Sequence, residues 1–379
     1  MKRGCGLLFF LTWGIAGFCQ EENMVAPLLQ KGYYLDAFQY TLQRDIHYTN
    51  LSLMLLASRV VLFWGSSTNG EYFSLSNSSG ETRTYYFPVA LVLEPFTNVS
   101  FTNEVLWELL ARYYDRGLHE NWFTQREEGA RRLLDSLQQY MVLSKKPDPS
   151  LVAGQVPALF LLGQTNQAME VATNLFRRYT RESRVVYVYA DLLRKTGNRT
   201  EALKTIQQYY PYVKTPSDKI LFTLLSGRLY LEEGNAREAL FVLERALYFS
   251  TNREILENIL DASRQVNDWQ RFTARALLLL SLNPEDVSLL SLIGRFFILS
   301  KQREWSEVFF ERALDEYGES HFRRGMLYFY WGEVYRNLAF PQKALWAYER
   351  AKEALLLVNP VPTESLATIE MMIYRVKTP

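Results

Sequence analysis

The chain has 379 residues, of which 48% are hydrophobic and 22% are charged, and its formal net charge is +1. This balance is that of an ordinary globular protein, and the near-neutral charge gives no support for nucleic-acid binding. The chain is long enough to bury a large core, either in one body or between repeated units.

The first 19 residues are typical of a secretory signal peptide. Lys2 and Arg3 precede an apolar run at residues 7–15, which is too short to span a bilayer comfortably, and the chain turns polar at Gln20. We therefore expect residues 1–19 to be a signal peptide rather than a buried helix, which is the alternative interpretation. The mature chain would be periplasmic or attached to the cell envelope in a bacterium, and secreted otherwise. No later segment is long and apolar enough to be a membrane span.

Both cysteines, Cys5 and Cys19, lie in this first segment, so the mature body has no disulfide. Residues 16–19 resemble a bacterial lipobox, in which the cysteine becomes the lipidated first residue of the mature protein. Phe18 departs from that pattern, which has a small residue before the cysteine. Ordinary cleavage after Ala16 or Cys19 is the alternative. A membrane is expected as a partner only through lipidation of Cys19.

The N-terminal region, residues 20–147, reads as helical with degenerate repeats and an insertion at residues 63–103. Inside the insertion, Phe73 and Leu75 alternate with serines, a turn signal follows, and the next residues favour strand, which predicts a β-hairpin. The apolar run Val89–Leu93, between two prolines, predicts a further short strand.

Helices are also expected on both sides of the insertion, at residues 21–62 and 104–142. The second of these stretches contains an enlarged loop at residues 117–125.

A repeating pattern of helix pairs extends over residues 149–360. The position of the second helix that is usually a small residue recurs at intervals of 34, 37, 33, 34 and 38 residues. Its residues are Ala168, Ala202, Ala239, Phe272, Ser306 and Ala344. Small residues of the first helix fall in step, at Ala190, Gly227, Gly294 and Gly332. Glycines mark the turn between the two helices in three units, at Gly163, Gly197 and Gly234, where a positive φ costs glycine little.

The clearest copy lies within residues 325–360. Its first helix carries Tyr328, Trp331, Gly332 and Tyr335, an aromatic-x2-large-Gly-x2-Tyr spacing, and its second helix carries Ala344, Tyr348 and Ala351. This copy resembles the tetratricopeptide repeat, whose signature is W-x2-L-G-x2-Y, then A-x3-F, then Pro, in a unit of 34 residues. The resemblance covers about two-thirds of the chain. It implies an all-α fold, a right-handed tetratricopeptide α-solenoid of helix-turn-helix units with a small β-hairpin insertion.

The resemblance also predicts how the rest of the chain is organised. Residues 149–360 would form about six repeats, and residues 361–379 a capping helix and tail. Two units depart from the signature, because residues 253–286 lack the glycines and Pro157 lies inside the first helix of residues 149–182.

No catalytic or metal-binding pattern is predicted. His47, His119 and His321 are scattered, and the chain has no G-x-S-x-G, H-E-x-x-H or phosphate-binding glycine loop. We therefore expect a protein that is not an enzyme, with no cofactor, no metal and no small-molecule substrate.

The resemblance implies that first-helix residues line a concave groove where a partner protein binds. Three are apolar or aromatic, at Tyr187, Leu224 and Phe329. Five occupy one charged position whose sign alternates, at Asp191, Arg228, Asp261, Arg295 and Glu333. Three more lie three residues further on, at Arg194, Arg264 and Arg336. The alternation has two interpretations, a self-neutralising ladder between units and a binding site for a segment of mixed charge.

The predicted function is therefore an exported scaffold for protein–protein interactions in the cell envelope, with its partner in this groove. The Lys/Asn pattern of the family's carboxylate clamp is absent, so chaperone C-termini are not expected partners. A glycan-binding or enzymatic module centred on residues 63–103 is the alternative function. Self-association through the repeats is a weaker one.

Overall fold

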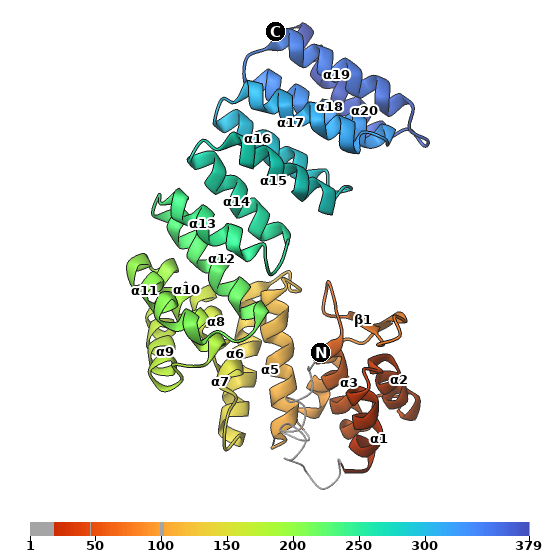
Figure 1. Ribbon diagram of the computed structural model, residues 1–379. Helices are drawn as coiled ribbons and strands as arrows, with labels where there is room; N and C mark the ends of the chain where they lie inside the picture. Colours follow the sequence, from red (N-terminus) through yellow and green to blue (C-terminus); the bar gives the residue numbers. More distant parts are fainter. Residues whose placement is uncertain (1–18, 46, 99–101, 379) are drawn as a thin grey trace. The chain divides into compact units, whose positions relative to one another are not determined.

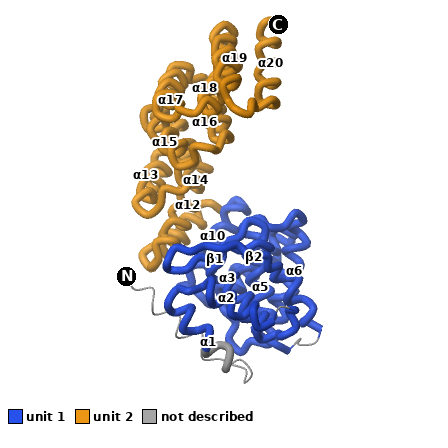
Figure 2. The backbone as a smooth tube through the Cα atoms, turned by 90° about the vertical axis from the view of Figure 1, so that its right-hand side faces the viewer, with its two compact units in different colours: residues 1–197 blue, residues 198–379 orange. Residues whose placement is uncertain are grey.

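The computed structural model describes residues 19–45, 47–98 and 102–378. Two compact units are present, formed by residues 1–197 and 198–379 and coloured separately in Figure 2. The apolar run of the expected signal peptide lies outside the described residues, and the first helix begins at Cys19. Among the described helices, none combines the length and apolarity that a bilayer crossing needs.

Unit 1 contains ten helices of at least four residues, one two-stranded sheet and one 3-10 turn within its described residues (Figure 1). Their bounds are α1 (Cys19–Gln30), α2 (Tyr34–Arg44), α3 (Leu51–Trp64), β1 (Tyr72–Ser76), β2 (Thr82–Tyr86), α4 (Val89–Leu93), η1 (Glu94–Phe96), α5 (Glu104–His119), α6 (Arg126–Leu143), α7 (Pro149–Val152), α8 (Gln155–Leu161), α9 (Thr165–Arg178) and α10 (Ser183–Lys195).

Unit 2 is a succession of helices, with one short 3-10 turn after the first of them. Their bounds are α11 (Arg199–Tyr209), η2 (Tyr210–Tyr212), α12 (Pro216–Glu232), α13 (Ala236–Ala246), α14 (Arg253–Gln265), α15 (Trp269–Leu282), α16 (Ser288–Leu299), α17 (Arg303–Tyr317), α18 (His321–Asn337), α19 (Pro341–Leu356) and α20 (Thr363–Lys377). Four helix hairpins, from α12–α13 to α18–α19, follow one another, and α20 packs on α19. The fold is an all-α solenoid of tetratricopeptide type with a small β insertion.

The predicted second-helix positions lie at the centre of the packing. All six side chains are fully buried, from Ala168 on α9 to Ala344 on α19. Space on the facing helix is equally tight, since a Cβ added to Gly332 would lie 2.6 Å from the Tyr348 ring. In this hairpin, α18–α19, the two helices approach so closely that a larger side chain than glycine does not fit at position 332.

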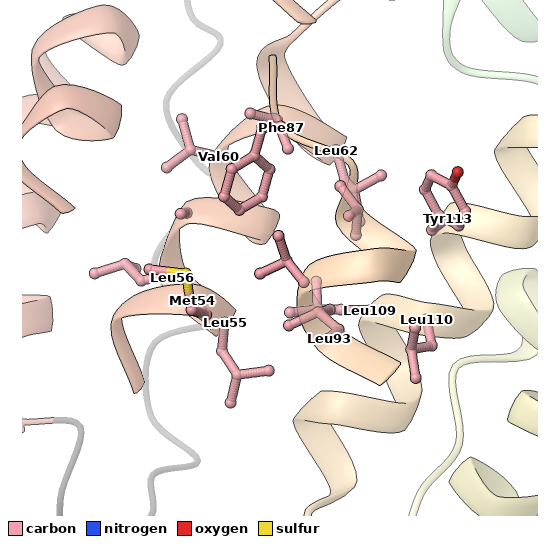
Figure 3. Close-up of a cluster of buried hydrophobic side chains, with 14 of the residues drawn as sticks. Met54, Leu55, Leu56, Val60, Leu62, Phe87, Leu93, Leu109, Leu110 and Tyr113 are labelled. Atoms are coloured by element: carbon pink, nitrogen blue, oxygen red, sulfur yellow. The ribbon is translucent and has the colours of Figure 1, made fainter. Parts of the chain in front are cut away.

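The predicted β-hairpin is confirmed, and it covers the core of unit 1. Strands β1 and β2 are antiparallel, with Phe73 opposite Tyr85, and Gly80 in the turn has φ +87°. Phe73 and Leu75 point inward and are fully buried. They belong to the same cluster as the apolar helix α3, part of which Figure 3 shows around Met54 and Leu55.

Val89–Leu93, predicted as a strand, forms the short helix α4 instead. A five-residue apolar run fits a buried strand or a buried helical turn equally well, so its neighbours decide. Here Val89, Val92 and Leu93 are buried at helical spacing, in the core shared with α3 and α5.

The predicted loop at residues 117–125 is also shorter than expected, because α5 continues to His119. Gly117 is a helical residue that makes room for a ring, since a Cβ there would lie 2.3 Å from Phe123 Cζ.

In the same unit, the helix that contains Pro157 is broken into α7 and α8. The proline lies in the first turn of α8, where its missing N–H costs little.

A left-handed residue ends the first helix of every repeat from α8–α9 onward. Three of these residues are the glycines named above, and the equivalents in the last three repeats are Asn267, Lys301 and Ala339, with φ of +58°, +53° and +64°. The conformation costs a non-glycine residue about 1–2 kcal/mol. A glycine variant avoids this cost. Part of the gain in stability is lost again, because glycine also raises the conformational entropy of the unfolded chain.

Ala339→Gly is therefore expected to raise the free energy of unfolding by about 0.5–1 kcal/mol, because it removes the Cβ from a left-handed position. Chemical denaturation measures the change. The control is Ala274→Gly at an exposed position within α15, which should lower the free energy by about 1 kcal/mol. Equal destabilisation by both substitutions would contradict the prediction.

Candidate functional site

The expected groove residues lie on the first helices of the repeats. Tyr187, Asp191 and Arg194 are on α10 of unit 1. The others are on α12, α14, α16 and α18 of unit 2. We describe the residues of each unit separately, and we call the set in unit 2 the first-helix face: Leu224, Arg228, Asp261, Arg264, Arg295, Phe329, Glu333 and Arg336.

The acidic residues of the predicted position each pair with the arginine three residues further along the same helix. Arg194 Nε and Nη2 lie 3.0 and 2.9 Å from Asp191 Oδ1. The corresponding distances from Arg264 to Asp261 Oδ1 are 3.1 and 2.5 Å. Residues three apart lie on one side of a helix, so these pairs follow directly from the spacing.

Glu333 pairs with Arg336 in the same way, at 2.9 Å between Arg336 Nη2 and Glu333 Oε2. It also accepts a hydrogen bond of 2.5 Å from the hydroxyl of Tyr348 on α19. Burial and this contact raise the pKa of Tyr348, so the phenol remains protonated and donates. Glu333 therefore joins the two helices of its hairpin, which gives this carboxylate a structural role.

In unit 2 the charges of the alternating position do not pair with one another as the ladder interpretation requires. Arg228 on α12 pairs with Glu254 in the first turn of α14, and Asp261 pairs within its own helix. Arg295 on α16 is exposed, and none of the carboxylates in the described chain forms an ion pair with it. Arg228 thus reaches the neighbouring repeat, but its partner there is not a residue of the alternating position.

A second contact between repeats on this face joins an arginine and a ring. The guanidinium of Arg264 on α14 lies 5.7 Å from the ring centre of Phe296 on α16, which is half-buried and adjacent in sequence to Arg295. Cations favour the face of an aromatic ring, so this contact fixes the position of Arg264. These helices thus carry one arginine that is paired with a carboxylate and lies over a ring, and one arginine without an ion pair in the described chain.

The predicted apolar contacts divide into two groups. Tyr187 and Phe329 are partly exposed, and the Phe329 ring packs at 6.0 Å against that of Tyr348. Leu224 is only 5% exposed and belongs to the core between α12 and α13, so it cannot meet a partner. A leucine at this position of an amphipathic helix lies close to the boundary between core and surface.

Sequence reasoning missed Glu254, Phe296 and Tyr348. Glu254 lies seven residues before Asp261, about two turns along the same side of α14, and its pairing with Arg228 could have been proposed from that. Phe296 and Tyr348 gave no such signal, because aromatic residues in these helices were attributed to packing.

The arrangement offers ion pairs and rings to a partner but no reactive group. Within the described residues, no group of three or more His, Cys, Asp or Glu side chains could hold a metal ion. The insertion contributes Phe73 and Phe87 to the core, and on its outer side Tyr72 and Tyr86 lie with ring centres 5.1 Å apart, each 51% exposed.

No protein-family model and no curated protein matches the sequence. Among solved structures, a monomeric mutant of IFIT1 with Gppp-AAAA matches at a TM-score of 0.51 and 13% identity, covering 90% of this chain and 82% of that one. A tetratricopeptide repeat protein from Parabacteroides merdae matches at a TM-score of 0.40 and 13% identity, covering 72% of this chain and 99% of that one. A thermophilic tetratricopeptide protein in Thermus thermophilus matches at 0.41 and 16%, covering 50% and 99%. At these identities the likeness concerns the fold alone.

Proposed function

We propose that the chain is a non-enzymatic exported scaffold that binds a segment of a partner protein along its first-helix face. The observation that carries the proposal is the exposed guanidinium of Arg295, which lacks a carboxylate partner among the described residues. Arginine and aromatic side chains are the types most enriched where proteins bind each other strongly, and the half-buried Phe296 is on the same helix, α16.

The paired charges around Arg295 favour a partner that brings both carboxylates and apolar side chains. Asp261 and Glu333 already hold Arg264 and Arg336, so a partner need not neutralise those arginines. A carboxylate of the partner can bind Arg295 through two parallel hydrogen bonds. An apolar side chain of the partner can pack on the exposed parts of Phe296 and Phe329.

Arg295→Glu tests this function. We expect the tagged mature chain to recover a specific partner from its native envelope, and the variant to recover at least tenfold less, since a charged hydrogen bond contributes about 1.5–3 kcal/mol. Quantitative mass spectrometry of the captured proteins measures the difference. Circular dichroism should show unchanged helix content, because Arg295 is exposed.

Arg350→Glu is the matched control, an exposed arginine on the second helix α19. It should recover the partner as well as the wild type does. Equal recovery by Arg295→Glu would remove the first-helix face as the binding site. Double substitution of Arg228 and Arg295 by Glu should lower recovery further, although this variant also breaks the pair with Glu254.

Export is the second part of the proposal, and it is supported by the signal-peptide pattern of residues 1–19. If Cys19 is lipidated, the wild type incorporates labelled palmitate and partitions into detergent, whereas Cys19→Ser does neither. Mass spectrometry of the mature N-terminus distinguishes this result from simple export. An unlipidated N-terminus at Gly17 or Gln20 would contradict anchoring, and an intact Met1 would contradict export.

A further inference from the structure

A second surface lies on the other helices of the repeats in unit 2. A cavity of about 800 Å³ opens between α13 and α15, the second helices of neighbouring repeats. This volume falls within the range of binding pockets. No residue of the first-helix face lines it.

The walls of this α13–α15 groove are rich in arginine. Two arginines come from α13, Arg237 and Arg245, and two from α15, Arg271 and Arg275. The lining also contains two carboxylates, of Glu244 and Asp268, so positive charge is in excess.

The carboxylates neutralise the arginines of α15. Arg275 Nη2 lies 2.7 Å from Glu244 Oε2, and Arg271 Nε lies 3.5 Å from Asp268 Oδ2. The arginines of α13 remain exposed, and no carboxylate in the described chain forms an ion pair with either of them. Arg245 instead lies over the ring of Phe241, at 5.7 Å from its centre.

Aromatic side chains accompany these unpaired charges. Phe241 on α13 is 67% exposed, and Tyr248, just after the end of that helix, is 89% exposed. Both line the groove. Large rings exposed beside arginines are characteristic of surfaces that bind another protein.

We propose that the α13–α15 groove binds an acidic segment of a partner protein that carries aromatic or aliphatic side chains. The carboxylates of the segment pair with Arg237 and Arg245, and its apolar side chains cover Phe241 and Tyr248. The N–H groups of the segment can donate to Glu244 and Asp268.

A peptide fits these groups better than a nucleic acid does. The phosphate backbone of a nucleic acid brings only acceptors and negative charge, so it has no donor for the free lone pairs of Glu244 and Asp268. A peptide backbone brings both donors and acceptors. The overall charge of +1 also provides no general attraction for a polyanion.

The test begins with selection of peptides from a displayed random library on the full mature chain. We expect enrichment of glutamate and aspartate next to phenylalanine, tryptophan or leucine. Affinity is then measured by fluorescence anisotropy for the most enriched acidic peptide. Double substitution of Arg237 and Arg245 by Glu should weaken binding at least tenfold, since a charged hydrogen bond contributes about 1.5–3 kcal/mol.

A second variant removes the rings and keeps the charges, by substituting Phe241 and Tyr248 with Ala. It should weaken binding several-fold, and the residual binding should fall as salt is added. Arg312→Glu is the matched control, an exposed arginine on the second helix α17 outside the groove. This control and Arg295→Glu should both bind the peptide normally.

Three results would overturn the proposal. The first is a selected set without acidic enrichment, and the second is unchanged affinity in the Arg237 and Arg245 double variant. The third is a single-stranded oligonucleotide that displaces the peptide at a lower concentration than the peptide itself requires. Arg295 belongs to the first-helix face and not to the groove. If Arg295→Glu loses the envelope partner but binds the peptide normally, the two surfaces act independently, and the failure of one proposal can be told from the failure of the other.

Discussion

Phe272→Ala is expected to lower the free energy of unfolding by about 3–5 kcal/mol, although alanine is the residue that the repeat pattern favours at this position. Phe272 is fully buried on α15. Its ring lies 5.1 Å from the rings of Trp269 and Phe297 and 5.9 Å from that of Phe296. Removing it would leave a cavity at the centre of a cluster of rings.

The reason lies in the facing helix. Where α10, α12, α16 and α18 have Ala or Gly at the matching position, α14 has Leu260, and its side chain is also fully buried. The hairpin α14–α15 is thus filled by two large side chains, and a single alanine cannot restore the closer packing of the other repeats.

Urea denaturation followed by circular dichroism measures the change, and hydrogen exchange in α14–α16 locates it. Phe249→Ala is the control, because that ring is 45% exposed and its removal should cost much less. A loss below about 1 kcal/mol for Phe272→Ala would show that the hairpin can close around the smaller side chain.

The repeat positions could be predicted from sequence because they depend on residue size at a fixed period. The turns were only half predictable. Glycine revealed three left-handed positions, but Asn267, Lys301 and Ala339 adopt the same conformation without a glycine. The energetic cost of about 1–2 kcal/mol is small enough for a packed repeat to tolerate, so residue type alone does not reveal it.

The insertion shows a second limit of the sequence. Its hairpin was predictable, because alternation of Phe73 and Leu75 with serines has the period of a strand. Val89–Leu93 has no such alternation, and only the packing of α4 against α3 and α5 made it a helix.

For the first-helix face, a contact could be predicted from the sequence only where its two residues are close together along the chain. Pairs three residues apart, such as Asp261 with Arg264, follow from helix geometry. Arg228 with Glu254 and Tyr348 with Glu333 join different helices, so they depend on how those helices cross. Whether Leu224 is buried depends on the same crossing.

Removal of α20 is the other change with a large expected effect. A chain that ends at Pro360 is expected to be less soluble and to fray in its last repeat, because each repeat buries its apolar face only against its neighbours. The helix α20 occupies most of the segment expected to form a cap, from Thr363 to Lys377. Ile369 and Met372 of α20 are 1% and 6% exposed, in the same cluster as Tyr348 and Leu355 of α19.

Apolar contact, rather than charge, is expected to hold α20 in place. Its ion pairs with α19, Lys352 to Glu370 at 2.6 Å and Lys377 to Glu349 at 3.0 Å, are exposed and contribute only about 0–1 kcal/mol each. Ile369→Ala should therefore cost about 2–5 kcal/mol locally, whereas Glu370→Ala should change little.

Amide hydrogen exchange in α18 and α19, together with light scattering, tests this expectation in the truncated chain and in both point variants. Met371→Ala is the matched control for Ile369→Ala, because Met371 is 44% exposed on the outer side of α20. Loss of protection in α19 should follow truncation and Ile369→Ala, but not Met371→Ala or Glu370→Ala. If the truncated chain stays monomeric with full protection in α19, the last repeat is stable without a cap, and burial of Leu355 by α20 is not what holds it.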